Sequence, residues 1–221
     1  MTLPTGAKLL LGKSRERAID VLRNNHYTRS VSSGKTYYFQ CGKAIVGFSI
    51  PPNRNIAKFV LGRESQVWEL SRLWAPDGHE RNLLTRAISL SVLEFRRVEP
   101  AAEALVAYAD PNAGHSGHVY AAASWVYAGQ SGESRCYVGA DGRPVARRKF
   151  HSGHAFIRKA GIEALGYKEV KLPGKLRFVR GLTPKAKRYI RSRWHGRRPA
   201  ATVRELVLSR RRSYEVEDKP C

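Results

Sequence analysis

Three polar side chains interrupt an apolar, strand-like run in the middle of the chain. The run extends from Gln66 to Trp74 and carries Glu69, Ser71 and Arg72, which a plain core strand would not contain. An arginine can bind an anion through two parallel hydrogen bonds, and a carboxylate can accept a proton from an amine. We therefore interpret Arg72 as a ligand for an anionic donor or phosphate, and Glu69 as facing the donor or the substrate amine.

The alternative for these residues is a purely structural one. A buried charge needs a partner, so Glu69, Ser71 and Arg72 could form an internal ion pair with a neighbouring strand. Side chains alternate between the two faces of a strand. We therefore expect Glu69 and Ser71 to point one way and Arg72 the other, which argues against one shared role.

A second apolar run ends in an acid. Residues 104–109 are followed by Asp110 and Pro111, and residues 81–97, between the two runs, have apolar side chains at helical spacing. A strand–helix–strand order makes two parallel strands through a right-handed crossover. Because ligands bind beyond the carboxyl ends of such strands, we expect Arg72 and Asp110 to belong to one site. The alternative is that Asp110 only caps the following turn.

The remaining elements must flank this unit. Periodicity and turn signals predict helices at 14–25, 119–128, 153–165 and 185–194, and hairpins that pair 37–40 with 44–50, 135–138 with 143–150, and 167–171 with 175–180. Residues 53–65 are expected to be a surface connection. The pattern predicts one α/β domain, residues 1–182, followed by a basic extension, residues 183–221.

The chain is strongly positive. Its 221 residues carry a formal net charge of +22, and such an excess attracts polyanions, with nucleic acid as the first candidate. An anionic membrane is the second, but the sequence shows no long apolar span and no leader, so we expect an intracellular protein with no membrane contact. The cysteines, Cys41, Cys136 and Cys221, are too widely spaced to suggest a disulfide framework or a thiolate metal cluster.

Basic residues gather in two places. The larger group lies in and after the last predicted helix, where no acidic residue balances it, and a smaller group follows the predicted strand 143–146. Charge runs are usually solvated faces, but this imbalance favours contact with phosphates. The predicted DNA-contacting residues are Arg147, Arg148, Lys149, Lys185, Lys187, Arg188, Arg191, Arg193, Arg197 and Arg198.

The tetrapeptide His-Ser-Gly-His occurs at residues 115–118 and again at 151–154. Imidazole is a ligand for both iron and zinc, so His115 and His118, together with Asp110, form a candidate metal site. The alternative is that these histidines face solvent or DNA.

The central residues together resemble a known family. The matching positions are His26-Tyr27, Gly47, Ser49, residues 69–73, Asn82, Thr85-Arg86, residues 108–110, His115, Gly117, Tyr120, Tyr127 and Gly129. In their order and spacing, from about residue 14 to 180, the chain resembles the Mom DNA-modification proteins of Mu-like phages. The resemblance implies a GNAT-like acyltransferase fold, with a mixed central sheet flanked by helices. It also implies conversion of adenine N6 in double-stranded DNA to a carbamoylmethyl form, which protects phage DNA from restriction in the cytoplasm of the bacterial host.

The resemblance also implies roles for single residues. It places Tyr27, Arg72, Asp110 and Tyr120 where the family's functionally required residues lie. An adenine amino group is a weak nucleophile, so Asp110 suits the role of its proton acceptor. Tyr120 could protonate a leaving group or orient the base, and its alternative is a core tyrosine. The residues predicted to contact the substrate are His26, Ser71, Thr85, Arg86, Tyr108 and His115.

One segment departs from the acetyl-CoA enzymes of this fold. They hold pyrophosphate with a Gly-rich loop at a helix N-terminus, whereas residues 76–82 here contain one glycine and two acids. The expected donor is therefore an activated acyl or aminoacyl group, with acetyl-CoA as one option. Two other functions stay open: a non-catalytic DNA-binding protein, and an N-acetyltransferase acting on protein or small amines. A dimer is one option for the oligomeric state.

Overall fold

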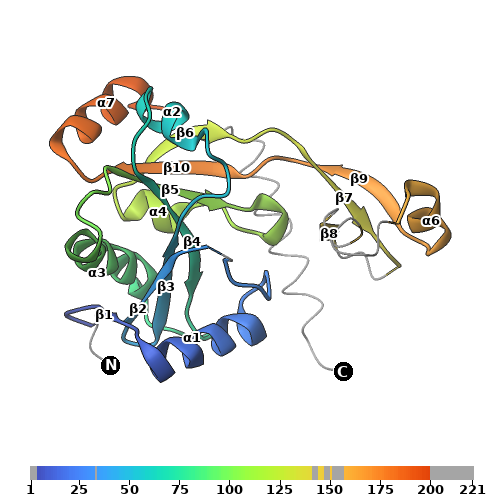
Figure 1. Cartoon of the computed structure of the whole chain (residues 1–221), viewed down its shortest axis with the longest axis horizontal. Helices are drawn as coiled ribbons and strands as arrows, with labels where there is room; N and C mark the ends of the chain where they lie inside the picture. Colours follow the sequence, from blue (N-terminus) through green and yellow to red (C-terminus); the bar gives the residue numbers. More distant parts are fainter. Residues whose placement is uncertain (1–3, 33, 141–143, 147–149, 151–156, 200–221) are drawn as a thin grey trace. The chain divides into compact units, whose positions relative to one another are not determined.

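The computed structural model describes residues 4–32, 34–140, 144–146, 150 and 157–199. The chain divides into two compact units, residues 1–129 with 176–221 and residues 130–175. The predicted α/β class, with a mixed central sheet flanked by helices, is confirmed (Figure 1). No helix among the described residues is long and apolar enough to cross a membrane.

The first unit is built on a seven-stranded sheet of order β1-β2-β3-β4-β5-β10-β6. Its strands are β1 (Lys8–Leu9), β2 (Thr36–Cys41), β3 (Ala44–Ser49), β4 (Val67–Trp74), β5 (Ala104–Ala109), β6 (Val126–Gln130) and β10 (Leu176–Gly181). As predicted, β4 and β5 are parallel, and α3 (Leu83–Val98) connects them. The strands on either side, β3 beside β4 and β10 beside β5, are antiparallel to their neighbours.

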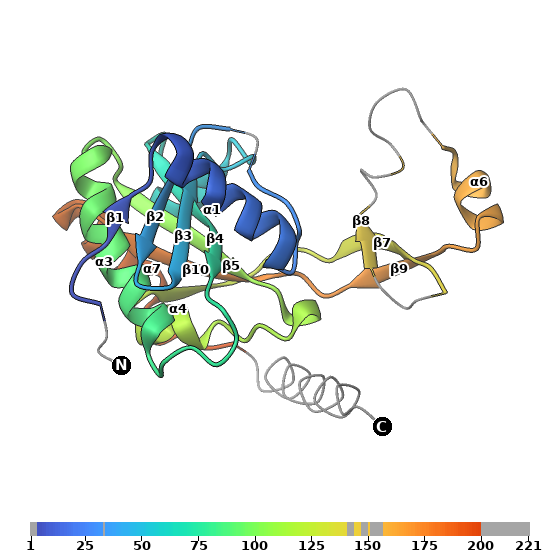
Figure 2. The same ribbon diagram turned by 90° about the horizontal axis from the view of Figure 1, so that it is seen from below.

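Helices cover both faces of this sheet. Alternate residues of the central strands, such as Leu70 and Ala107, pack in one core against α3 and α4 (His118–Ala122). The residues between them, such as Val67 and Val106, face a second core with α2 (Ile56–Leu61) and α7 (Pro184–Trp194). On that second face, α1 (Gly12–Asn25) packs through Leu22 against β2 and β3. Figure 2 shows α1 and α3 on opposite sides of the strands.

Two predictions about single segments are wrong. The segment 53–65, expected to be a surface connection, contains α2, which buries Ile56, Ala57, Val60 and Leu61 in the second core. The helix expected at 119–128 ends at Ala122, because Ser124 adopts a left-handed backbone with φ of 63° and β6 begins at Val126.

The second unit contains a three-stranded sheet of order β8-β7-β9 with one helix, α6. Its elements are β7 (Ser134–Val138), β8 (Pro144–Ala146), α6 (Lys159–Ala164) and β9 (Lys168–Leu172). The predicted pairing of 135–138 with 143–150 is present as β7 with β8. The hairpin predicted from 167–171 and 175–180 is wrong, because β9 pairs with β7 whereas β10 pairs with β5 in the large sheet.

Gly117 is required by its position before α4. Its φ is +78°, and a Cβ atom there would lie 2.2 Å from the ring of Phe178. The left-handed backbone costs an alanine about 1–2 kcal/mol, and the overlap about 1–3 kcal/mol more. We therefore expect Gly117→Ala to lower the free energy of unfolding by about 2–5 kcal/mol in a urea titration. Gly132→Ala is the control, because its Cβ would meet nothing within 4 Å; equal losses in both variants would contradict the prediction.

Candidate active site

Strands β4 and β5 stop pairing before either strand ends. Their pairing joins residues 67–70 to residues 104–107, whereas β4 continues to Trp74 and β5 to Ala109. The two strands therefore part at their carboxyl ends. Arg72 lies on the unpaired part of β4, and Asp110 directly follows β5.

A β-bulge at Ser71 changes the direction of the side chains that follow it in β4. Against β3, Glu69 is opposite Ser49 and Arg72 is opposite Gly47, so Ser71 is the extra residue. Ser49 and Gly47 are two positions apart and share a face, and Glu69 and Arg72 therefore share a face as well. The prediction that they point to opposite faces is wrong, because the inserted residue resets the alternation.

Arg72 connects β4 to the loop that follows α1. Its Nε donates to the carbonyl of Ser30 at 2.6 Å, its Nη2 to Ser30 Oγ at 3.1 Å, and its Nη1 to the carbonyl of Ser71 at 2.5 Å. Gly47 leaves room for this arrangement, since a Cβ there would lie 2.9 Å from the ring of Tyr38 and 3.2 Å from Arg72 Cβ. The guanidinium is thus held in one orientation on the face that carries Glu69.

Tyr27 lies at the centre of the predicted group. Burial of its hydroxyl raises its pKa to about 12; the charges of Asp110 and Glu69 add to this rise, and the charge of Arg72 opposes it. Residues from two neighbouring strands, Glu69 and Arg72 on β4 and Asp110 after β5, therefore lie close enough to act on one phenol. The residue as a whole remains 49% exposed, so part of the ring is open to a substrate.

Two histidines contact the Tyr27 ring. The ring of His115 meets it edge-on at 4.8 Å between centroids, and that of His26 lies at 4.6 Å. His26 is buried, and the backbone N–H of Thr28 donates to its Nδ1 at 3.2 Å, so a neutral ring carries its proton on Nε2. Tyr27 therefore contacts one buried histidine, His26, and one exposed histidine, His115.

Tyr120 is buried in the core, and its hydroxyl lies within electrostatic range of Tyr27. It packs against Trp125 and Phe178 in the core on the α3 side of the sheet. Burial raises its pKa, and the nearby groups of Tyr27 and Glu69 raise it further. Tyr120 lies on the α3 face of the sheet and Glu69 on the opposite face. We infer that the two influence each other through the opening where β4 and β5 part. At neutral pH the Tyr120 hydroxyl keeps its proton and can act as a donor.

Asp110 likewise has a structural and an electrostatic role. Its Oδ1 accepts hydrogen bonds from the backbone and side-chain nitrogens of Asn112, at 2.9 and 3.0 Å, so it does cap the following turn. The backbone N–H of His115 donates to the Asp110 carbonyl at 3.0 Å. The same carboxylate acts on the pKa of Tyr27. One acid therefore fixes the loop that carries His115 and also influences the Tyr27 hydroxyl through its charge.

Arg177 belongs to the same face but was not predicted from the sequence. It is opposite Tyr108 in the pairing of β10 with β5. Burial raises the pKa of Tyr108; the charge of Arg177 opposes this rise and that of Glu69 adds to it. The sequence could have indicated Arg177, because it is an arginine within an apolar strand, the same feature that identified Arg72.

Some predicted residues are not placed with Tyr27. Thr85 and Arg86 lie on α3, where Arg86 Nε donates to the carbonyl of Pro4. His118 Nδ1 shares a hydrogen bond of 2.5 Å with Ser116 Oγ, and no three His, Cys, Asp or Glu side chains of the described residues gather as metal ligands. The predicted iron or zinc site at Asp110, His115 and His118 is therefore not supported.

The predicted DNA-contacting residues fall into two groups. On α7, Ala186, Ile190 and Trp194 are buried in the second core, and Thr183 Oγ1 caps the helix by accepting from Ala186 N at 3.2 Å. The opposite face of α7 and the residues after it carry exposed basic side chains, namely Lys185, Lys187, Arg188, Arg191, Arg193, Arg197 and Arg198. The other predicted contacts, Arg147, Arg148 and Lys149, lie outside the described residues.

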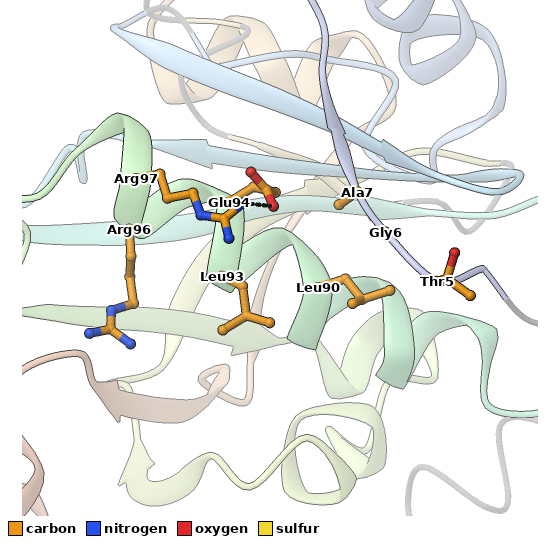
Figure 3. Close-up of a pocket in the computed structure, with 8 residues that line it drawn as sticks. All are labelled: Thr5, Gly6, Ala7, Leu90, Leu93, Glu94, Arg96 and Arg97. Atoms are coloured by element: carbon orange, nitrogen blue, oxygen red, sulfur yellow. Dashed lines mark hydrogen bonds and ion pairs between the residues drawn. The ribbon is translucent and has the colours of Figure 1, made fainter.

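A pocket of about 510 Å³ lies elsewhere, between residues 5–7 and α3 (Figure 3). Its α3 wall consists of Leu90, Leu93, Glu94, Arg96 and Arg97. None of the predicted site residues lines this pocket. The candidate site is therefore the group gathered where β4 and β5 part.

The pKa of Tyr27 gives a test of this grouping. Because the pKa is raised to about 12 in the folded protein, Tyr27 stays neutral between about pH 10 and 12, where an unfolded tyrosine ionises. Its contribution to stability is therefore complete below about pH 10 and is lost as the pH rises toward 12. We expect an absorbance titration of tyrosinate in the wild type and in Tyr27→Phe to coincide up to about pH 11. A difference already present at about pH 10 would contradict the arrangement.

Three comparisons relate the chain to known proteins. A model of the Mom protein family matches residues 12–197. The methylcarbamoylase mom of Escherichia phage Mu is 29% identical over 125 residues, which are 53% of this chain and 51% of that protein, so the chain spans about half the length of this relative. A solved structure, described as a CoA-dependent acyl-homoserine lactone synthase, MesI, aligns over 85% of this chain and 90% of that chain, with 9% identity and a TM-score of 0.38.

Proposed function

Because the chain belongs to the Mom protein family, we propose that it is a DNA-modifying transferase that converts adenine N6 to a carbamoylmethyl form. The modification would protect phage DNA from restriction enzymes in the cytoplasm of the bacterial host. The observation that carries the proposal is that Tyr27, half exposed and in contact with His115, lies within electrostatic range of Glu69, Arg72 and Asp110, at the end of the sheet where β4 and β5 part.

Transfer of the group to adenine N6 needs a residue that accepts the N6 proton and a residue that binds the donor. In the proposed step, a bond forms between adenine N6 and the methylene carbon of a donor that carries a carboxamide, and the bond from that methylene carbon to its leaving group breaks. Asp110 accepts the N6 proton, and Tyr120 donates to the leaving group. Arg72 binds the anionic part of this activated donor. Acetyl-CoA would instead transfer an acetyl group, which is the reaction of the N-acetyltransferase alternative.

The base must leave the duplex to reach these residues. The exposed part of Tyr27, with His115 against its ring, offers a surface on which an extruded adenine can stack. Residues 183–221 would act as a DNA-binding extension of the catalytic domain, residues 1–182. The basic face of α7 would hold the phosphates, and these contacts would fix the position of the duplex without specifying its sequence.

The phosphate-binding role of α7 is best tested by substitution. Deleting the helix would remove Ile190 and Trp194 from the second core, so a loss of DNA affinity would be confounded by a loss of stability. We expect Arg188→Gln with Arg191→Gln to lower the slope of log affinity against log salt concentration by about 0.9 for each phosphate that the variant no longer binds. The matched control is Lys13→Gln with Arg17→Gln on α1, which are also exposed. Equal changes in both double variants would contradict the placement.

The experiment that tests the proposed function is a nucleoside mass measurement. DNA from bacteria that express the protein is digested to nucleosides, and the deoxyadenosine fraction is compared with that from cells without it. The proposal predicts a new deoxyadenosine species heavier by one carbamoylmethyl group in place of a hydrogen. Unmodified deoxyadenosine, together with tight binding of DNA by the purified protein, would contradict the proposal.

That second outcome corresponds to a specific alternative. Asp110 caps a turn and Tyr120 packs in a core, so both have structural reasons to be present in a protein that only binds DNA. Tyr27 favours the transferase, because it is half exposed, contacts His115 and lies within electrostatic range of Glu69, Arg72 and Asp110.

A further inference from the structure

Two arginines from different elements meet at one aromatic ring. The guanidinium carbon of Arg177, on β10, lies 3.9 Å from the ring centroid of Phe59 on α2. That of Arg193, on α7, lies 5.8 Å from the same centroid. A single cation over a ring is ordinary packing, but two cations at one ring repel each other.

Both guanidinium groups are held in place. Arg193 Nη1 donates to Tyr189 Oη at 2.8 Å, and that hydroxyl fits against Gly62, where a Cβ would lie only 2.4 Å away. Arg177 lies opposite Tyr108 on the neighbouring strand, with its guanidinium carbon 5.9 Å from the centroid of that ring. The Nε of Arg177 is buried and has no hydrogen-bond partner among the described residues.

Neither charge is neutralised within the described part of the chain. None of the ion pairs found there, such as Lys35 with Glu99 or Arg63 with Glu103, includes Arg177 or Arg193. Holding two cations together without a carboxylate costs free energy, and a bound anion would remove that cost. A phosphate matches the planar guanidinium group, which can donate two hydrogen bonds to it.

The arginine pair connects the basic face of α7, which includes Arg193, to the sheet, where Arg177 lies opposite Tyr108. Arg193 belongs to α7, whereas Arg177 neighbours Tyr108, whose pKa also responds to the charge of Glu69. Basic side chains alternating with aromatic rings are the pattern with which proteins follow a nucleic acid strand. A strand whose duplex rests on α7 would therefore pass this pair before reaching Tyr27.

We propose that Arg177 and Arg193, gathered at Phe59, clamp a backbone phosphate of the DNA strand whose adenine enters the site. The clamp rests on the proposed function, since it names a contact of the same substrate. It would hold the strand beside the site while the base is extruded, and Phe59 would fix the spacing of the two cations.

The test measures binding of the full chain to two labelled oligonucleotide duplexes, one fully paired and one with a single unpaired adenine. We expect Arg177→Gln and Arg193→Gln each to weaken binding of the second duplex by about tenfold at 0.1 M salt. Because both arginines hold one phosphate, the two decreases in salt slope should together come to about 0.9. Phe59→Leu keeps both charges and should weaken binding less, by about threefold. Arg97→Gln removes one charge from the outer face of α3 and should change affinity by less than about twofold.

Several outcomes would overturn the clamp. These are unchanged affinity and slope in the Arg177 and Arg193 variants, or an equal loss in Arg97→Gln. Unchanged affinity and salt slope would also be seen if Arg177 and Arg193 bound the phosphates of the donor instead of those of DNA. Arg193 is exposed, so its variant decides the matter even if Arg177→Gln lowers the melting temperature.

The clamp and the proposed function can fail separately. Loss of binding in both arginine variants, with unmodified deoxyadenosine in cells that express the wild type, would contradict the transferase and leave the clamp standing. Modified deoxyadenosine, with unaltered binding in both variants, would contradict the clamp alone.

Discussion

Replacing Asp110 with asparagine is expected to lower the fraction of modified deoxyadenosine in cellular DNA by about a hundredfold to ten-thousandfold, the range typical of a lost general base. Asparagine keeps an Oδ1 that can accept the two hydrogen bonds from Asn112, so the loop that carries His115 should keep its shape. What the substitution removes is the negative charge and the capacity to take a proton from adenine N6.

The measurement is the same nucleoside digest, accompanied by DNA binding of the purified variant. Binding should stay within about twofold of the wild type, because Asp110, an anion, does not bind a phosphate and the basic residues of α7 are unchanged. Asp20→Asn, an exposed carboxylate of α1, is the matched control and should leave modification unchanged. An Asp110→Asn protein that still modifies DNA at the wild-type level would remove Asp110 from the chemistry.

Replacing Arg72 with lysine is expected to lower modification by about a hundredfold, although the positive charge is kept. Lysine is a point charge without a planar fork, so it cannot bond the Ser30 carbonyl, Ser30 Oγ and the Ser71 carbonyl from one orientation. The loop that carries Tyr27 would lose its attachment to β4, and a donor anion would lose a bidentate partner.

The Arg72 variant has a second readout that a general loss of stability would not give. The charge of Arg72 lowers the pKa of Tyr27. A lysine at position 72 would lack the hydrogen bonds that hold the guanidinium near Tyr27, so the pKa of Tyr27 should rise further. Arg96→Lys, an exposed arginine of α3, is the control. Wild-type modification in Arg72→Lys, or an equal loss in Arg96→Lys, would show that the fork geometry has no role.

The centre of the fold could be predicted because its elements have strong local signals. Three segments have clear apolar patterns: the predicted strands at 66–74 and 104–109 and the predicted helix at 81–97 between them. A crossover between two parallel strands has only one favoured hand. The sequence therefore predicts that Arg72 and Asp110 lie at the same end of the sheet. It also predicts the basic helix that ends the described chain, since Thr183 and Pro184 are strong start signals.

The details of the site could not be predicted for two physical reasons. A bulge such as that at Ser71 depends on how two strands register, and nothing in the residues themselves marks the extra position. The short helix α2 has only six residues, and tertiary burial of Ile56 and Val60, rather than local propensity, stabilises it. Phe59 lies on this helix, so the arginine pair at its ring was not predicted either.

Pairing between distant segments was the other source of error. The chain from β9 to β10 has the turn signal of a hairpin, at Pro173 and Gly174, but the two strands belong to different sheets. Strand β10 instead adds to β5, and this places Arg177 opposite Tyr108. Long-range pairing of this kind is decided by which apolar faces are left to cover, which a local pattern does not contain.

The most direct measurement of the central claim is a structure of the protein bound to a duplex with one unpaired adenine. We expect the adenine to lie outside the helix against Tyr27, with its N6 within about 3 Å of an Asp110 carboxylate oxygen and the Tyr120 hydroxyl nearby. An adenine that stays stacked in the duplex, or that occupies the pocket beside Leu90 and Leu93 instead, would contradict it.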